Sequence, residues 1–268
     1  MKGIAAPISV VLAAAALLIA GPAGAQMQPH RAEYTLRLGT ALNATRIGSI
    51  VQDIARECDG WRIRRELSVD ASLTPSFKVS FTSRLEGKEP RGNDFTWRAV
   101  QVLNGTEREM RGTAEREAGT WRVDRTTPDG PQQSILPSFT LMPVTAVDYL
   151  VRRLARGSES FPLLLFVAEA DGGAFRLDVK RVTTGAADTT PPSQRRVEVP
   201  ATRSWPFSMI VTRAGQPDAK PIVTLRGRLF DSGVMDGVVA DAGVVTVAAH
   251  LRDLQMREAP TCPGSNQR

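Results

Sequence analysis

The segment Trp61–Val69 has the sequence WRIRRELSV, and its side chains alternate in character with a period of two. One face of the extended segment is apolar and the other is charged or polar: Trp61, Ile63, Leu67 and Val69 against Arg62, Arg64, Glu66 and Ser68. Successive side chains of a β-strand point to opposite faces of its sheet. This alternation therefore predicts an antiparallel strand with one face in the core and the other in water.

The same alternation recurs along most of the chain. Residues Arg31–Leu38 and Phe77–Leu85 show it most clearly, with apolar side chains at alternate positions. Further strand-like runs are 95–103, 121–124, 175–182, 205–211, 223–229 and 244–254. The dipeptide Asn104-Gly105 separates two strand-like runs and favours the tight turn of a β-hairpin. The sequence therefore predicts a mainly β fold.

One segment has helical periodicity instead. Apolar side chains recur there at helical spacing, namely Val144, Val147, Leu150, Val151 and Leu154. We predict an amphipathic helix over Thr145–Arg156, with Thr145 and Asp148 as a capping box and Gly157 as its end. The apolar stripe of this helix must be buried. A single-domain curved antiparallel sheet, spiral or barrel-like, that wraps around this central helix or is capped by it satisfies both elements.

The first 25 residues have the features of a secretory signal peptide. Lys2 precedes the apolar run Ile8–Ala20, and Ala23-Gly24-Ala25 supplies a small-x-small cleavage pattern. We expect cleavage before Gln26, which leaves residues 26–268 as one domain. The apolar run is short for a transmembrane helix, and no later stretch is long and apolar enough to cross a membrane. The mature chain is therefore predicted to be exported and not membrane-spanning.

Cys58 and Cys262 are the only cysteines of the chain. Because exported proteins meet an oxidising environment in which paired thiols persist, we expect these cysteines to form a disulfide. Such a bond would tie the start of the mature chain to its end. In the chain-entropy model, a loop of this length gives a stabilisation of roughly 5 kcal/mol.

Composition and motifs argue against several classes of function. The net charge is +6, but acidic and basic residues are interleaved, so a nucleic-acid-binding tail is not supported. The chain has no zinc-type cysteine spacing, P-loop, dinucleotide-binding glycine motif or nucleophile elbow. His30 and His250 lack a partner motif, and we interpret them as surface or hydrogen-bonded structural residues. We expect no catalytic residues, metal site or cofactor, and a cryptic envelope hydrolase is the weaker alternative.

The tryptophans lie on predicted strands: Trp61, Trp97, Trp121 and Trp205. Core packing is the simpler interpretation, because each indole carries a large apolar surface. The alternative is that they line a cavity enclosed by the curved sheet, as in lipocalin-type barrels. Leu165, within the apolar run Leu163–Val167, is a further candidate for this lining, unless the run is a strand buried on both faces.

Several short motifs follow one another in a distinctive order. They are His30-Arg31-Ala32-x-Tyr34-x-Leu36, Cys58-Asp59-Gly60-Trp61, Ile135-Leu136-Pro137, Trp205-Pro206, Gly233-Val234, Asp241 and Cys262. In this order and spacing the set resembles the alphaproteobacterial periplasmic cell-envelope integrity family called EipB. The resemblance covers nearly the whole mature chain. Residues 241–244 depart from the family pattern, which often has aromatic side chains there.

The resemblance implies a periplasmic β-spiral that contains one helix and is closed by a disulfide between Cys58 and Cys262. Its architecture would be similar to that of lipoprotein carriers with apolar cavities. The implied role is non-enzymatic support of the cell envelope, by binding an apolar envelope component or a periplasmic protein partner. The alternative function is that of a carrier for a lipid or lipoprotein acyl chain.

Overall fold

The computed structural model describes residues 27–262, apart from 42, 75–76, 92–93, 171–172, 183–196 and 217–219. The described residues form one sheet of 15 strands and one helix. The strands are β1 (His30–Leu38), β2 (Arg46–Arg56), β3 (Gly60–Thr74), β4 (Phe77–Pro90), β5 (Asp94–Leu103), β6 (Thr106–Glu117), β7 (Thr120–Thr127), β8 (Gly130–Leu136), β9 (Thr140–Leu141), β10 (Ser160–Phe166), β11 (Ala174–Arg181), β12 (Ser204–Arg213), β13 (Val223–Phe230), β14 (Met235–Asp241) and β15 (Thr246–Met256). The helix α2 spans Pro143–Ala155. The predicted signal peptide, residues 1–25, lies outside the described residues and stays a prediction.

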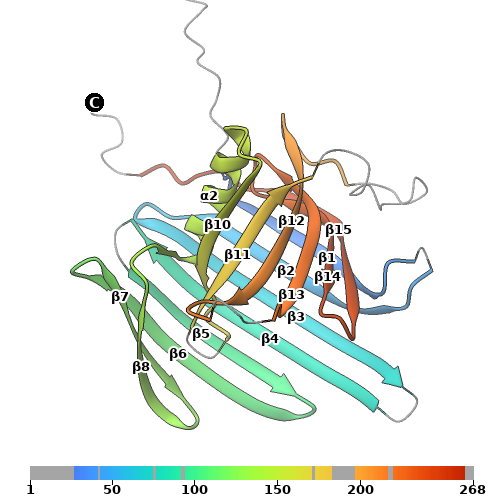
Figure 1. Cartoon of the computed structure of the whole chain (residues 1–268), viewed down its shortest axis with the longest axis horizontal. Coiled ribbons are helices and arrows are strands. Elements are labelled where there is room, and N and C mark those ends of the chain that lie inside the picture. The colour runs from blue at the N-terminus through green and yellow to red at the C-terminus, as the bar shows by residue number, and fades with distance from the viewer. Residues whose placement is uncertain are drawn as a thin grey trace, which may run out of the picture.

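The sheet is a long meander that curls back on itself. Its strand order is β8-β7-β6-β5-β4-β3-β2-β1-β15-β14-β13-β12-β11-β10-β9. Adjacent strands are antiparallel except β9 and β10, which run parallel. Figure 1 shows β10 to β13 in front of β2 to β4, with α2 at one end of the curled sheet. The prediction of a mainly β, barrel-like single sheet with one helix is confirmed.

The pairing of β1 with β15 joins the first and the last strand of the described chain, in the middle of the sheet order. His30 lies opposite Met256, and Leu38 lies opposite Val247. On its other side β1 pairs with β2, so the strand is hydrogen-bonded along both edges. Strands β8 and β9 stand at the two ends of the sheet order, and the sheet is therefore nearly closed rather than a complete barrel.

The observed burial follows the period-two pattern. In β5, Phe95, Trp97 and Ala99 are buried while the residues between them are exposed. The predicted hairpin at Asn104-Gly105 is confirmed, since both residues have the positive φ angles of a tight turn, 49° and 86°. The predicted strand 244–254 was placed too early, because Val244 is 99% exposed and the strand begins at Thr246.

Two of the long strands are absent from the predicted strand ranges, although the hairpin predicted at Asn104-Gly105 implies a strand after it. Strand β2 (Arg46–Arg56) has no clean alternation, and its burial pattern is correspondingly irregular. Strand β6 (Thr106–Glu117) looks polar throughout, and within it only Met110 and Ala114 are fully buried. Both strands are held by neighbours on each side, so their backbone hydrogen bonds do not depend on a strong apolar pattern of their own.

Helix α2 forms as predicted, but its N-terminus differs from the prediction. The helix starts at Pro143 rather than Thr145, and Met142 at the N-cap position provides no side-chain hydrogen bond. The expected capping box of Thr145 and Asp148 is therefore wrong. Proline is well suited to the first helical position because its φ angle is already helical and its missing N–H would have no partner there. Gly157 ends the helix with a φ of 81°, as expected.

The acceptors for the start of α2 come from β4. The carboxylate of Glu89 accepts hydrogen bonds from the backbone N–H groups of Val144, at 2.8 Å, and of Thr145, at 2.9 Å. The Thr145 hydroxyl donates to the same carboxylate. A negative charge at this position also interacts favourably with the positive end of the helix dipole. A strand residue thus provides the cap that the local sequence lacks.

Candidate functional site

The curled sheet and α2 enclose an apolar cavity of about 380 Å³. One wall comes from strands β1 to β4 and the opposite wall from β10 to β15, while α2 contributes Val144, Val147 and Leu150. This volume lies within the range of about 300–1,000 Å³ that is usual for small-molecule pockets. The cavity lies between the two layers of the sheet seen in Figure 1.

The wall of this cavity is apolar except in one region. The polar side chains among its lining residues are Tyr34, Gln52, Arg65 and Glu169. Arg65 interrupts the apolar face of β3, and its guanidinium forms an ion pair with the carboxylate of Glu169. Gln52 of β2 lies directly opposite Arg65 in the antiparallel register. These residues form a polar site, Gln52–Arg65–Glu169, within an otherwise apolar interior.

The backbone next to Glu169 is anchored to the opposite side of the sheet. The side-chain amide of Gln101, on β5, donates to the carbonyl of Glu169 at 3.4 Å. The guanidinium of Arg125, on β7, donates to the carbonyl of Ala170 at 3.2 Å. These contacts hold the backbone of the segment that follows β10 against the inner face of β5 and β7, and the ion pair with Arg65 holds the Glu169 carboxylate at β3.

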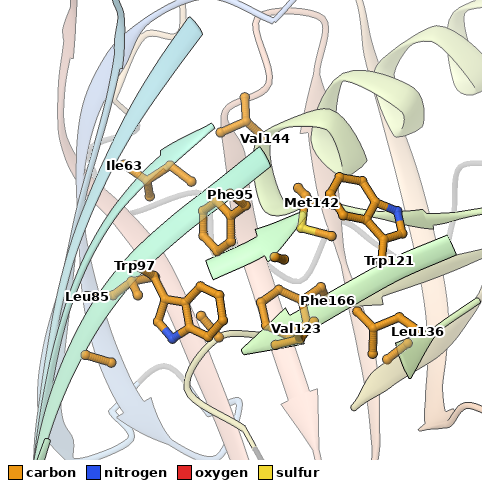
Figure 2. Close-up of a cluster of buried hydrophobic side chains, with 14 of the residues drawn as sticks. Ile63, Leu85, Phe95, Trp97, Trp121, Val123, Leu136, Met142, Val144 and Phe166 are labelled. Atoms are coloured by element: carbon orange, nitrogen blue, oxygen red, sulfur yellow. The ribbon is translucent and has the colours of Figure 1, made fainter. Parts of the chain in front are cut away.

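An aromatic cluster fills the interior beside the cavity. The rings of Phe95 and Trp97 stack with centroids 5.6 Å apart, and Phe166 meets them edge-on at 6.0 and 5.1 Å. Figure 2 shows this cluster below Val144 of α2. Gly112 on β6 leaves the space for the Trp97 indole, since a Cβ there would lie 2.6 Å from the ring. This part of the interior is filled by side chains, so the shell is hollow in one region and packed in another.

The structure brings Leu165 to the cavity but not the four tryptophans. Trp97 and Trp121 are buried in the cluster of Figure 2. Trp61 packs at the edge of that cluster, with the guanidinium of Arg56 4.7 Å from its ring centroid. Trp205 is buried in a second cluster together with the apolar face of α2. None of the four tryptophans lines this cavity, and the lining of the cavity is aliphatic at most positions. A part for the tryptophans in lining a ligand site stays a prediction.

A family model described as EipB-like matches residues 22–258. The chain belongs to the EipB-like family.

The EipB-like chain also resembles a solved structure. The crystal structure of a β-barrel-like protein of the domain of unknown function DUF1849 from Brucella abortus superposes with a TM-score of 0.71. The two chains are 19% identical, and the match covers 87% of this chain and 100% of that one. At this identity the likeness shows the fold alone. No curated protein matches the sequence.

The disulfide of this EipB-like protein is formed by the two predicted cysteines. Cys58, in the turn between β2 and β3, bonds to Cys262, which follows β15, and their Cα atoms are 5.5 Å apart. Nearby, Arg257 pairs with Asp53 at 2.7 Å, and its backbone N–H donates to the carbonyl of Pro29. The segment after β15 is thus fastened to β2 by an ion pair and to the turn after β2 by a covalent bond.

The two histidines lie apart and differ in their surroundings. His30, on β1, is buried, and its Nδ1 lies 2.8 Å from the carbonyl oxygen of Gln28, which requires the proton to be on Nδ1. Burial lowers the pKa of His30, while Gln28 and the charge of Asp53 oppose this shift. His250, on β15, is half-buried, and burial lowers its pKa as well. His30 is therefore buried and hydrogen-bonded, and its purely structural role stays a prediction.

Two negative findings concern the described part of the chain. Within that part of the chain, no group of three or more histidine, cysteine and acidic side chains is placed to hold a metal ion. Within the same part, no helix has the length and apolar character needed to cross a membrane.

The polar site in the cavity was not found from the sequence. Arg65 and Glu169 are 104 residues apart, and nothing in the sequence near either one indicates the other as its partner. The available signal was the break that Arg65 makes in an alternating apolar face, between Ile63 and Leu67. A charged residue at an inward position of a strand indicates a buried partner or a ligand.

Proposed function

We propose that this protein is a non-enzymatic periplasmic component that supports cell-envelope integrity by holding an apolar envelope molecule, such as a lipid or lipoprotein acyl chain. The observation that carries this proposal is the apolar cavity between the two layers of the curled sheet. Burying an acyl chain there would gain about 0.8 kcal/mol for each methylene group removed from water. Membership of the EipB-like family and the disulfide support an exported protein of the envelope.

The test is mass spectrometry of protein purified from its own periplasm, in the native state and after organic extraction. We expect an acyl lipid at a near-stoichiometric level. The variant Leu165→Trp, which places an indole where Leu165 now lines the cavity, should lose the lipid. The variant Ile210→Trp, at a position that is 42% exposed, makes a matched control and should retain it.

A clean mass without lipid would contradict this function. Activity would then have to reside on the outer surface, in contact with a protein partner. A deletion strain offers an independent check, because loss of the protein should make cells more sensitive to detergent. Detergent resistance equal to that of the wild type would count against a role in the envelope.

A further inference from the structure

The charges of the polar site in the cavity restrict which head groups a ligand can carry. This inference rests on the proposed function. Arg65 and Glu169 are the charged side chains among the residues that line the cavity, and they are paired with each other. Glu169 is largely buried, with 11% of its side chain exposed, whereas Arg65 retains 37%. The guanidinium is therefore already neutralised before a ligand arrives.

An anionic head group would meet both charges at once. A carboxylate placed within reach of Arg65 would also lie beside the Glu169 carboxylate, where like charges repel more strongly than in water. The backbone at Glu169 and Ala170 is held by Gln101 and Arg125, and the Glu169 carboxylate pairs with Arg65, so the carboxylate lies close to any group that Arg65 binds. The site thus contains a repulsive element against anions.

An uncharged polar head group fits the same atoms without this cost. Carbonyl and hydroxyl oxygens can accept hydrogen bonds from Arg65 and from the Gln52 amide, and a hydroxyl can donate to Glu169 or to the Gln52 oxygen. Gln52 stands opposite Arg65 on the neighbouring strand, so donors and acceptors occur side by side. No unpaired charge would be buried by such a ligand.

We propose that the cavity selects amphiphiles whose head group is an uncharged ester or amide bearing hydroxyls, and discriminates against anionic amphiphiles with the same chain. The acyl chain occupies the aliphatic part of the cavity, and the head group lies at Gln52, Arg65 and Glu169. Glu169 is the residue that sets this selectivity. In its absence, Arg65 would present an uncompensated positive charge to the ligand.

The test compares 1-monolauroylglycerol with laurate by isothermal titration at pH 8, with each amphiphile kept below its aggregation concentration. The full mature protein should bind the glyceride at least about tenfold more tightly, a difference of roughly 1.4 kcal/mol. In Glu169→Gln, laurate should bind at least about tenfold more tightly than it does to the wild type, while the affinity for the glyceride should change by less than about threefold. The control is Glu66→Gln, since Glu66 pairs with Arg84 on the outer face and is 63% exposed. It should leave both affinities unchanged.

The outcomes separate this inference from the proposed function. Tighter or equal binding of laurate by the wild type would overturn the selectivity but leave a hydrophobic carrier intact. An unchanged preference in a folded Glu169→Gln variant would overturn the role of Glu169. Binding of neither amphiphile would overturn the proposed function and the selectivity together. The comparison in the wild type does not depend on the folding of any variant.

Discussion

At the scale of single residues, Glu89 joins the sheet to the helix. Its carboxylate is buried, and it accepts hydrogen bonds from the first turn of α2. Burial raises the pKa of Glu89, while the hydrogen bonds from Thr145 and Val144 oppose the shift. The carboxylate oxygens of Glu89 therefore stabilise the helix as hydrogen-bond acceptors. Keeping this buried carboxylate charged costs free energy, because it is removed from water.

We expect Glu89→Ala to lower the free energy of unfolding by about 1–2 kcal/mol, because two backbone N–H groups of α2 lose their acceptor. Urea denaturation followed by circular dichroism measures this difference. Glu86→Ala, on the exposed face of the same strand, should cost less than about 0.5 kcal/mol. Equal losses of unfolding free energy in the two variants would show that the hydrogen bonds from α2 to Glu89 stabilise the protein no more than a surface ion pair does.

The cost of Glu89→Ala should also depend on pH. A raised pKa means that the folded state binds the proton of Glu89 more tightly than the unfolded state does. The stabilisation from the protonated form is present below the ordinary pKa of 4.5 and is lost as the pH rises through the raised value. The difference between the wild type and the variant should therefore be larger at pH 4 than at pH 7, as measured by urea unfolding at both pH values.

His30 should give a pH dependence of the opposite sign. Its pKa is lowered by burial, so the unfolded state binds the proton more tightly, and stability falls as the pH drops below about 6.5. The free energy of unfolding should fall between pH 8 and pH 5, and His30→Gln should reduce this slope. His250 contributes with the same sign, and His250→Gln measures its share. A slope unaffected by His30→Gln would contradict the argument.

At the scale of elements, α2 is held mainly by its apolar face. Leu154 is 1% exposed and packs in the cluster that contains Trp205 and Phe207. The opposite face carries Arg152, which pairs with Asp148 one turn earlier, at 2.9 Å. Buried packing of this kind contributes far more free energy than a partly exposed ion pair.

We therefore expect Leu154→Ala to cost about 2–5 kcal/mol, since it leaves a cavity between α2 and the sheet. Arg152→Ala on the same helix should cost about 0.5 kcal/mol or less. Thermal and urea unfolding of the two variants give the comparison. A small effect of Leu154→Ala would mean that the helix is not needed to stabilise the sheet around it.

At the scale of the whole molecule, the disulfide closes the chain on itself. Cys58 and Cys262 are separated by 204 residues, so the bond spans almost the whole described chain. The double variant Cys58→Ser/Cys262→Ser should lose about 2–5 kcal/mol of stability, the usual cost of removing a native disulfide, with roughly 5 kcal/mol expected from the chain-entropy model. Urea unfolding of the oxidised protein and the variant measures the loss. Equal midpoints would show that the pairing of β1 with β15 is sufficient to close the fold.

Much of this architecture follows from local sequence. The alternation in β3 and β5 indicates strands because side chains of an extended chain reach opposite faces, whatever lies around them. Asn104-Gly105 indicates its hairpin because both residues tolerate a positive φ. The two cysteines indicate their own pairing because no other thiol competes. The inward-facing residues of β6 escape this kind of inference, because a small residue such as Gly112 is needed only where a neighbour such as Trp97 fills the space.

The sequence by itself determined the mainly β class, the helix between the two groups of strands and the disulfide, all of which depend on periodicity or on residue identity. Only the tertiary structure decided the helix cap from Glu89, which lies 55 residues before Val144, and the pairing of Arg65 with Glu169. It also decided that the interior is hollow beside Leu165 and filled beside Trp97. The physical reason is that caps, buried ion pairs and cavities depend on which distant side chains meet, and the curl of the sheet sets those meetings.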